Sequence, residues 1–134
     1  MGLPPQAMEP VTVLHYAPGE RFLPHYDFLD PDARGMAAEI ARSGQRVATF
    51  LLYLNDDYDG GETAFPRLGL SHRGGAGEGL YFSNLGRDRQ PDRRTLHAGL
   101  APTGGEKWVL SQWIRDRVPS GVGDPHLVAA LNGR

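Results

Sequence analysis

The chain has 134 residues, of which 40% are hydrophobic and 22% charged, with a net charge of −2 and a pI of about 6.2. This length allows one domain with one modest core, and the charge favours neither a nucleic-acid-binding nor a membrane-surface protein. The chain has no cysteine, which excludes disulfides and thiolate metal sites and leaves His, Asp and Glu as candidate ligands.

Abundant glycine (18) and proline (11) separate many short extended runs, which is typical of an all-β sandwich or barrel. In chain order we expect strands over residues 11–16, 21–26, 46–54, 63–65, 79–83, 95–98 and 106–115. The run 46–54 is almost continuously apolar and predicts a strand buried on both faces. Residues 71–79 are expected to form a glycine-rich loop.

Two segments outside the strands have helical character. Residues 33–41 fit two turns of helix that stop near Gly44, and they fit a polar loop equally well. Asp124 and Pro125 predict the N-cap and first residue of a short C-terminal helix that runs through Leu131. No apolar run approaches the ~18 residues of a membrane-spanning helix. The first residues lack the pattern of a signal peptide, so we expect a cytoplasmic protein.

The pair His25-x-Asp27 stands at the end of the second expected strand. Alternate residues of a strand share one face, so both side chains can point at one metal while Tyr26 points away. By itself the pattern is weak, because it also fits a surface histidine beside a loop aspartate.

His97 differs from the other downstream histidines in its surroundings. His72 lies in the glycine-rich loop and His126 in the expected C-terminal helix, and both positions suggest contact with solvent. His97 lies in an apolar strand, where a histidine without partners would be a core residue. Together with His25 and Asp27 it completes two imidazoles and one carboxylate, the ligand set of non-haem Fe(II) oxygenases, which leaves coordination positions open.

Lys107 lies near the start of the last long strand, on the same face as Val109, Ser111 and Trp113. Both faces of this strand are largely apolar, and a buried ammonium needs a counter-charge. Since Glu106 points the other way, we expect the carboxylate of a ligand to satisfy Lys107, with Ser111 donating a second hydrogen bond. The alternative is a lysine that extends from the strand start into water.

Several segments, taken together and in order, resemble the prolyl 4-hydroxylase-like Fe(II)/2-oxoglutarate dioxygenases. The resemblance covers about residues 11–115 and implies a mainly β fold, the double-stranded β-helix or jelly roll, with short peripheral helices. Its segments are Tyr16-x-Pro18-Gly19-Glu20, His25-x-Asp27, Arg46-x-Ala48-Thr49, Tyr53-Leu54-Asn55-Asp56, Gly60-Gly61-Glu62-Thr63-x-Phe65-Pro66, His97-Ala98-Gly99, Gly105-x-Lys107-Trp108 and Trp113-x-Arg115.

The resemblance also implies roles for single residues. His25, Asp27 and His97 would ligate Fe(II), and Lys107 would pair with the distal carboxylate of 2-oxoglutarate. Further contacts to the co-substrate are expected from Tyr53, Tyr16, Thr63 and Ser111. A core tyrosine with a backbone partner is the simpler interpretation of Tyr53.

The implied reaction hydroxylates a prolyl residue, or a similar C–H bond of a peptide, protein or small molecule, and releases succinate and CO₂. Its implied co-substrates are 2-oxoglutarate and O₂, with ascorbate as an accessory that keeps iron ferrous. The sequence indicates neither a nucleic-acid nor a membrane partner, and it leaves the substrate and the oligomeric state open.

We expect one domain over residues 1–134 with a core at about 11–115. Catalytic domains of the family usually begin with helices that support the outer face of the larger sheet, yet only about ten residues precede the first expected strand. Either the chain is part of a longer one, or that face is covered otherwise, or it is exposed. This short lead motivates an alternative function, a catalytically weak sensor or interaction module that binds iron and 2-oxoglutarate.

Overall fold

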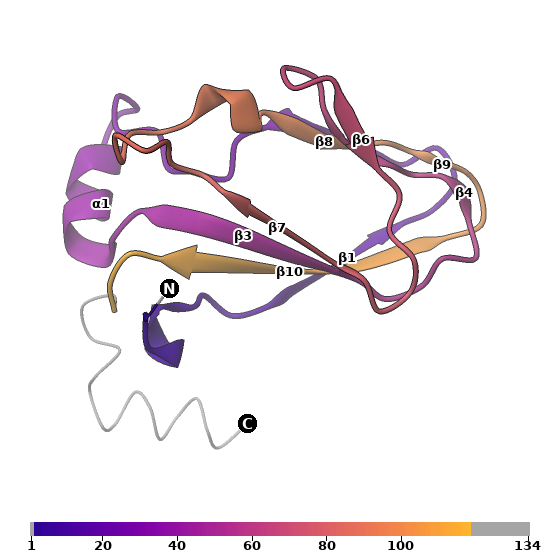
Figure 1. The fold of residues 1–134 in the computed structure, drawn as a ribbon, viewed down its shortest axis with the longest axis horizontal. Coiled ribbons are helices and arrows are strands. Elements are labelled where there is room, and N and C mark those ends of the chain that lie inside the picture. The colour runs from indigo at the N-terminus through magenta and orange to yellow at the C-terminus, as the bar shows by residue number, and fades with distance from the viewer. Residues whose placement is uncertain (1, 119–134) are drawn as a thin grey trace.

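A computed structural model describes residues 2–118 of the chain, which fold into two antiparallel four-stranded sheets lying face to face (Figure 1). The larger sheet has the spatial order β1 (Thr12–Tyr16), β10 (Lys107–Arg115), β3 (Arg46–Tyr53) and β7 (Gly79–Ser83). The smaller sheet has the order β2 (Phe22–His25), β8 (His97–Gly99), β5 (Thr63–Phe65) and β6 (Leu70–His72). A two-stranded sheet of β4 (Asp59–Gly60) and β9 (Pro102–Gly104) lies at one end. This arrangement confirms the predicted jelly roll.

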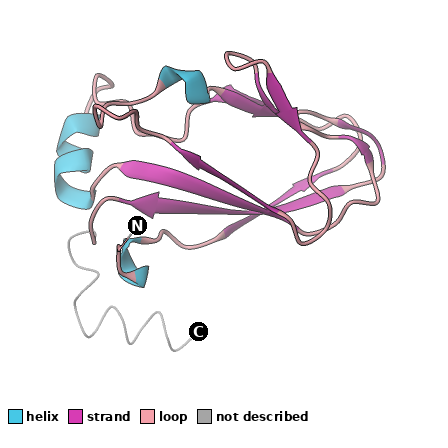
Figure 2. Cartoon of the chain, viewed as in Figure 1, coloured by secondary structure: helices cyan, strands magenta, loops and turns pink. Residues whose placement is uncertain are grey.

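Three short helices accompany the sheets (Figure 2): α1 (Met36–Ser43), η1 (Pro5–Ala7) and η2 (Arg93–Thr95), the last two of 3₁₀ type. Of the two alternatives for the insertion before β3, the helix is therefore the right one. It ends where Gly44 adopts a left-handed φ of 82° and donates its N–H to the Ile40 carbonyl at 2.8 Å. A side chain would be strained at this φ, and a Cβ would lie 2.4 Å from the Asp116 carboxylate.

Strand β10 sets the position of the polar residues that face the smaller sheet. It pairs with β1 on one side, where Tyr16 lies opposite Lys107, and with β3 on the other, where Tyr53 lies opposite Val109. Because alternate residues of each strand point to one face, the register brings Tyr16, Lys107 and Tyr53 to the same end of the interior.

The prediction that the long strand is buried on both faces is wrong for its outer face. The inward-facing Thr49, Leu51 and Tyr53 of β3 are buried, but the outward-facing Phe50 and Leu52 are only half-buried. On the same outer face Val13 is 51% exposed and Tyr81 53% exposed. These exposed fractions show that no segment among residues 2–118 covers the middle of that face.

The remaining differences concern short elements. Strand β2 ends at His25, so Asp27 lies in the bend beyond it, and the strand expected at 95–98 starts only at His97, after η2. Strand β6 occupies the start of the expected glycine-rich loop, and β4 and β9 were not expected. Elements of two or three residues are too short for an alternating pattern to be recognised. The helix predicted through Leu131 lies outside the described residues.

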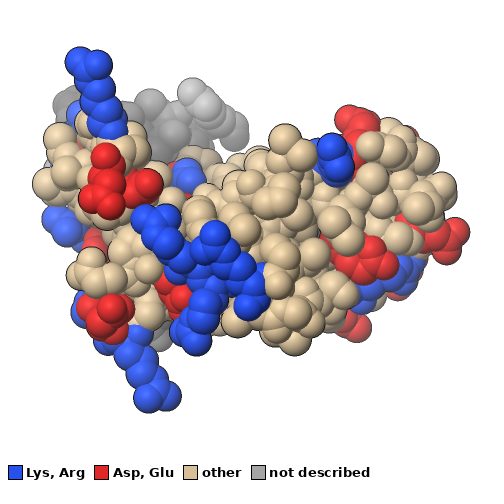
Figure 3. All heavy atoms as spheres, turned by 90° about the horizontal axis from the view of Figure 1, so that it is seen from above, with Lys and Arg blue, Asp and Glu red and all other residues tan. Residues whose placement is uncertain are grey.

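The side of the molecule that carries η2 and the smaller sheet is shown in Figure 3, where arginine side chains gather with carboxylates beside them. Two arginines of η2 have acidic partners, with 2.8 Å between Arg94 and Asp92 and 3.9 Å between Arg93 and Asp30. None of the helices described within residues 2–118 is long and apolar enough to span a membrane.

Candidate active site

The two sheets enclose a cavity with an empty volume of about 500 Å³, part of which opens to solvent. Its walls come from the inward faces of both sheets and from the bend after β2. The lining residues are Leu14, Tyr16, Phe22, His25, Asp27, Leu51, Thr63, His97, Gly99, Lys107, Val109, Ser111 and Trp113.

His25, Asp27 and His97 converge on one point of this cavity, as the sequence predicted. Strands β2 and β8 pair with His25 opposite His97, and the bend after His25 turns Asp27 toward both rings. Asp27 Oδ1 lies 3.3 Å from His25 Nε2 and 3.5 Å from His97 Nε2. All three ligand atoms lie within 4.8 Å of one another, a spacing at which one metal ion can reach each of them.

Backbone carbonyls fix the orientation of both imidazoles. His25 Nδ1 lies 2.7 Å from the Leu23 carbonyl and His97 Nδ1 lies 2.8 Å from the Thr95 carbonyl. A carbonyl oxygen only accepts, so each Nδ1 carries a hydrogen, and each Nε2 is directed at the shared point, where its lone pair is available to a metal when the ring is neutral. This is the tautomer that a metal-binding histidine needs.

Asp27 is held by a hydroxyl on its other oxygen. Thr49 Oγ1 donates to Asp27 Oδ2 at 2.8 Å, and Asn84 Nδ2 donates to Thr49 Oγ1 at 3.1 Å. Burial by itself raises the pKa of Asp27, but hydrogen bonds from His25, His97 and Thr49 outweigh it and bring the pKa well below the ordinary value. Burial likewise lowers the pKa of His25, while its hydrogen bonds with Asp27 and Leu23 raise it, with a net increase.

Two nitrogen donors and one ionised carboxylate oxygen fit a divalent transition metal such as Fe(II). Thr49 and Asn84 were not assigned a role from the sequence. Strand parity did place Thr49 on the inward face with Leu51 and Tyr53, but no local pattern relates Asn84 to it across the sheet.

Lys107 is buried, with 2% of its surface exposed, which excludes the alternative of a lysine that extends into water. Its ammonium donates to the Gly61 carbonyl at 2.7 Å and lies 5.0 Å from the centroid of the Tyr16 ring. Burial lowers the pKa of Lys107 to about 8, although the charge of Glu62 opposes the shift. Glu106 is exposed and lies 3.4 Å from His15, as its outward direction predicted.

The other predicted contact residues lie in the same cavity or beside it. Tyr16, Thr63 and Ser111 line the cavity and are buried. Burial, followed by the charges of Tyr53 and Asp27, raises the pKa of Tyr16 to about 12, so its phenol stays protonated at neutral pH. Tyr53 is fully buried and shares a 2.8 Å hydrogen bond with Thr63, through which it reaches the cavity.

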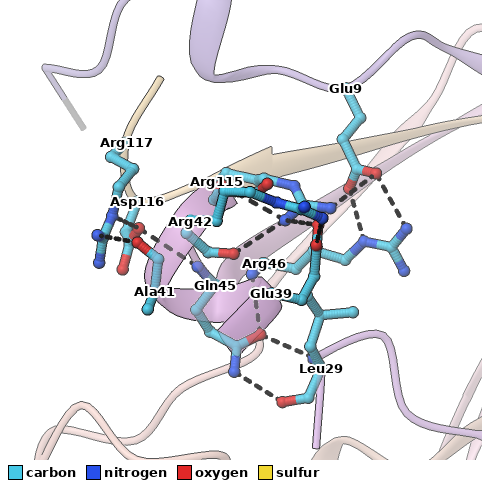
Figure 4. Close-up of polar contacts among 12 residues, drawn as sticks. Glu9, Leu29, Glu39, Ala41, Arg42, Gln45, Arg46, Arg115, Asp116 and Arg117 are labelled. Atoms are coloured by element: carbon cyan, nitrogen blue, oxygen red, sulfur yellow. Dashed lines mark hydrogen bonds and ion pairs between the residues drawn. The ribbon is translucent and has the colours of Figure 1, made fainter. Parts of the chain in front are cut away.

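A polar network outside the cavity fixes the chain that follows Asp27 (Figure 4). The Gln45 side chain accepts from the Leu29 N–H at 2.7 Å and donates to the Leu29 carbonyl at 2.8 Å. Next to it, Arg46 pairs with Glu9 at 2.6 Å and lies 4.2 Å from the centroid of the Trp113 ring, a lining residue. The start of β3 thus anchors both the ligand-bearing bend and one wall of the cavity.

Known proteins carry the same pattern. Residues 11–115 match the family described as the 2OG-Fe(II) oxygenase superfamily. Prolyl 4-hydroxylase 1 of Arabidopsis thaliana is 34% identical over 131 residues, covering 88% of this chain and 44% of that protein. Human prolyl 4-hydroxylase subunit alpha-1 is 34% identical over 116 residues, covering 87% of this chain and 22% of the subunit.

Solved structures agree with these relatives. The viral collagen prolyl hydroxylase of Paramecium Bursaria Chlorella virus-1, in its 2OG complex, has a TM-score of 0.68 and 37% identity, covering 81% of this chain and 59% of the other. A prolyl-4-hydroxylase of Pseudomonas putida has a TM-score of 0.54 and 25% identity, covering 84% and 56%. The chain spans less than half the length of the curated relatives named above. Since the match includes both sheets and every side chain that converges in the cavity, the chain belongs to the 2-oxoglutarate- and Fe(II)-dependent oxygenase superfamily.

Proposed function

We propose that this chain forms the catalytic core of a 2-oxoglutarate-dependent dioxygenase that hydroxylates prolyl residues of a peptide or protein. The observation that carries the proposal is one cavity that contains both a convergent His–Asp–His set and a buried lysine without a carboxylate partner in the described part of the chain. The two features together fit a metal ion and a dicarboxylate bound beside it.

His25, Asp27 and His97 would hold Fe(II) through the two Nε2 atoms and Asp27 Oδ1. Three protein donors leave the positions that a chelating co-substrate and O₂ require. When bound, the iron and 2-oxoglutarate supply oxidative decarboxylation to succinate and CO₂ and the transfer of an oxygen atom to a C–H bond. Ascorbate would serve as an accessory reductant that keeps the iron ferrous.

Lys107 would orient 2-oxoglutarate by pairing with its distal carboxylate. The buried ammonium already has its place fixed by the Gly61 carbonyl, so an incoming carboxylate meets a preorganised charge. The hydroxyl of Ser111 lies on the same face of β10, and Thr63 is held toward the cavity by Tyr53. The mostly apolar walls exclude water around the acidic co-substrate, which strengthens its attraction to Lys107.

The choice of a prolyl substrate rests on relatives that are named prolyl 4-hydroxylases. Apolar lining residues such as Leu14, Phe22 and Trp113 are compatible with a proline ring. The same cavity would also accept other small apolar side chains, so the identity of the substrate must be measured.

The direct test is conversion of 2-oxoglutarate to succinate by the iron-loaded protein, with and without proline-containing peptides. We expect succinate to form, and mass spectrometry to show the gain of one oxygen atom on a peptide, with both signals lost in His97→Ala. Turnover no higher than in that control would contradict the proposal. Binding of iron and 2-oxoglutarate with no succinate under any condition would instead identify the sensor module.

A further inference from the structure

We propose that Thr49 and Asn84 are positioning residues that restrict Asp27 to one metal-binding oxygen; this inference rests on the proposed function. The three side chains form a buried hydrogen-bond chain that starts outside the cavity and ends on the metal-binding carboxylate. Asn84 and Thr49 are both 0% exposed, and Asp27 is 5% exposed. Bulk water therefore does not reach the side chains of Thr49 and Asn84 in this arrangement.

The direction of the hydrogen bonds follows from the groups themselves. Ionised Asp27 can only accept hydrogen bonds, so the Thr49 hydroxyl donates its single hydrogen to Asp27 Oδ2. The Thr49 oxygen is then left to accept, and Asn84 Nδ2 donates to it. The Asn84 amide thus keeps the hydroxyl turned toward Asp27 and away from the backbone.

The two carboxylate oxygens of Asp27 consequently have different partners. Oδ1 faces the two Nε2 atoms at 3.3 and 3.5 Å, whereas Oδ2 is occupied by Thr49 at 2.8 Å. A carboxylate whose second oxygen is free can chelate a metal through both oxygens. Such chelation would consume a coordination position that 2-oxoglutarate or O₂ needs, since three protein donors leave only about three positions of an octahedral site.

Chain topology explains why both residues are in reach. Thr49 lies on the inward face of β3, opposite Phe82 of β7, and Asn84 directly follows the end of β7. Its N–H donates to the Val47 carbonyl at 2.9 Å, which fixes the backbone of Asn84 to β3. Residues of the larger sheet thereby fix the orientation of Asp27, the metal ligand that lies in the bend after β2.

The test uses Mn(II) as a redox-inactive substitute for Fe(II), with three measurements on the whole chain. Calorimetry gives the Mn(II) affinity and the 2-oxoglutarate affinity of the Mn(II) protein, and the water-proton relaxivity of bound Mn(II) reports the number of coordinated waters. The main variant is Thr49→Val, which keeps the shape and removes the hydroxyl. Thr49→Ser restores the hydroxyl, and Thr103→Val makes the same change at an exposed position of β9.

We expect Thr49→Val to bind Mn(II), with relaxivity reduced by about a third because one water is displaced. Its 2-oxoglutarate affinity should fall about tenfold or more, within the range for groups that orient metal ligands. Thr49→Ser and Thr103→Val should match the wild type in all three measurements. Asn84→Ala should shift relaxivity and affinity in the same direction by a smaller factor.

Wild-type relaxivity and wild-type 2-oxoglutarate affinity in folded Thr49→Val would overturn the inference, and so would a folded Thr49→Val that binds no Mn(II). If Thr49→Val does not fold, Asn84→Ala decides: unchanged relaxivity and affinity in that variant overturn the inference. Failure of the wild-type protein to bind Mn(II) or 2-oxoglutarate would be a different result, because it overturns the proposed function and this inference with it.

Discussion

Lys107 is a charged residue that is buried even in the ligand-free protein. Its ammonium has the Gly61 carbonyl as hydrogen-bond acceptor and two tyrosine rings at 5.0 and 5.9 Å, but in the described residues it makes no ion pair. A carbonyl and ring faces compensate only part of the lost hydration of an ammonium. The incompletely compensated ammonium therefore lowers the stability of the ligand-free protein. A dicarboxylate that pairs with Lys107 removes this destabilisation, which favours its binding.

Replacement of Lys107 by methionine tests whether the buried ammonium lowers the stability of the ligand-free protein while it enables 2-oxoglutarate binding. We expect Lys107→Met to raise the free energy of unfolding of the ligand-free protein at pH 7 by about 2 kcal/mol, because a buried unpaired charge is removed. The same variant should lose measurable 2-oxoglutarate binding while still binding metal. Denaturant unfolding and calorimetry check the two effects, and a variant less stable than the wild type would show that the ammonium is well compensated without ligand.

The pH dependence of 2-oxoglutarate binding follows from the lowered pKa of Lys107, which is about 8 in the free protein. A bound carboxylate favours the ammonium and raises this pKa, so binding takes up a proton above pH 8. We expect the 2-oxoglutarate affinity to be constant below pH 8 and to fall up to tenfold per pH unit above it. Calorimetry between pH 6.5 and 9.5 measures the profile.

Stability should show the opposite trend in the same range. The pKa of Lys107 is lower in the folded state than in the unfolded state, so above pH 8 the unfolded chain binds more protons and the free energy of unfolding rises with pH. This contribution should be absent from Lys107→Met. An arginine in place of Lys107 stays charged at these pH values, so 2-oxoglutarate affinity in a folded Lys107→Arg protein should not depend on pH.

Among single residues, the sequence predicted the candidate metal ligands and Lys107, but not the residues that hold Asp27 and Lys107 in place. His25, Asp27, His97 and Lys107 could be found because the H-x-D spacing, the apolar surroundings of His97 and the cost of a buried charge are visible in local sequence, although Asp27 lies in a bend and not in the strand. Thr49 and Asn84 could not be assigned, because their contact with Asp27 depends on how β3, β7 and the bend after β2 meet in space. The Gly61 carbonyl that accepts from Lys107 is a backbone atom and leaves no trace in residue type.

At the scale of elements, the junction of α1 and β3 holds the segment that carries Asp27. The Gln45 side chain makes three hydrogen bonds there, with the N–H and the carbonyl of Leu29 and with the N–H of Arg46. Asp116, just after β10, adds an acceptor for the Gln45 N–H at 3.3 Å. The segment that follows Asp27 is thus attached to the start of β3 by the Gln45 amide.

Loss of that amide should therefore weaken the fold locally. We expect Gln45→Ala to lower the free energy of unfolding by about 1–3 kcal/mol, since the part-buried backbone groups of Leu29 lose their partners. Limited proteolysis should show faster cleavage within residues 28–35. The matched control Gln90→Ala changes an exposed side chain and should stay within about 0.5 kcal/mol of the wild type. Equal effects of the two substitutions would contradict a special role for Gln45.

The long and patterned elements were predictable, and the short ones were not. Strands 63–65 and 79–83 have the predicted bounds, and β3 and β10 differ by one residue at one end, because alternation and β-forming residues are visible over such runs. The helix α1 begins at Met36 and not at residue 33, because Gly35 just before it has a left-handed φ of 81°. Strands β4 and β9 exist only through their pairing with each other.

At the scale of the whole molecule, the two faces of the larger sheet differ sharply. The inner face carries the cavity, while the outer face exposes apolar side chains, with Val13 51%, Tyr81 53% and Trp108 41% exposed. Large apolar side chains that gather on one exposed sheet face are a common feature of protein interaction surfaces. The described part of the chain therefore has a cavity on one face of the larger sheet and exposed apolar side chains on the other.

Substitutions on opposite faces of the larger sheet can separate the contributions of these two faces. We expect Val13→Thr combined with Tyr81→Thr to reduce binding of an apolar dye and to change the free energy of unfolding by no more than about 0.5 kcal/mol. Metal and 2-oxoglutarate affinities should not change. Leu14→Thr, one residue away but facing the cavity, should leave dye binding unchanged and lower stability. A large loss of stability in the outer-face variant would mean that this face is covered in solution.

The most direct measurement is a crystal structure of the protein grown with Mn(II) and 2-oxoglutarate. The account predicts one metal ion bonded to His25 Nε2, His97 Nε2 and a single oxygen of Asp27, with a carboxylate of 2-oxoglutarate on the Lys107 ammonium. A metal ion bound elsewhere, or a co-substrate whose carboxylates both lie away from Lys107, would contradict it.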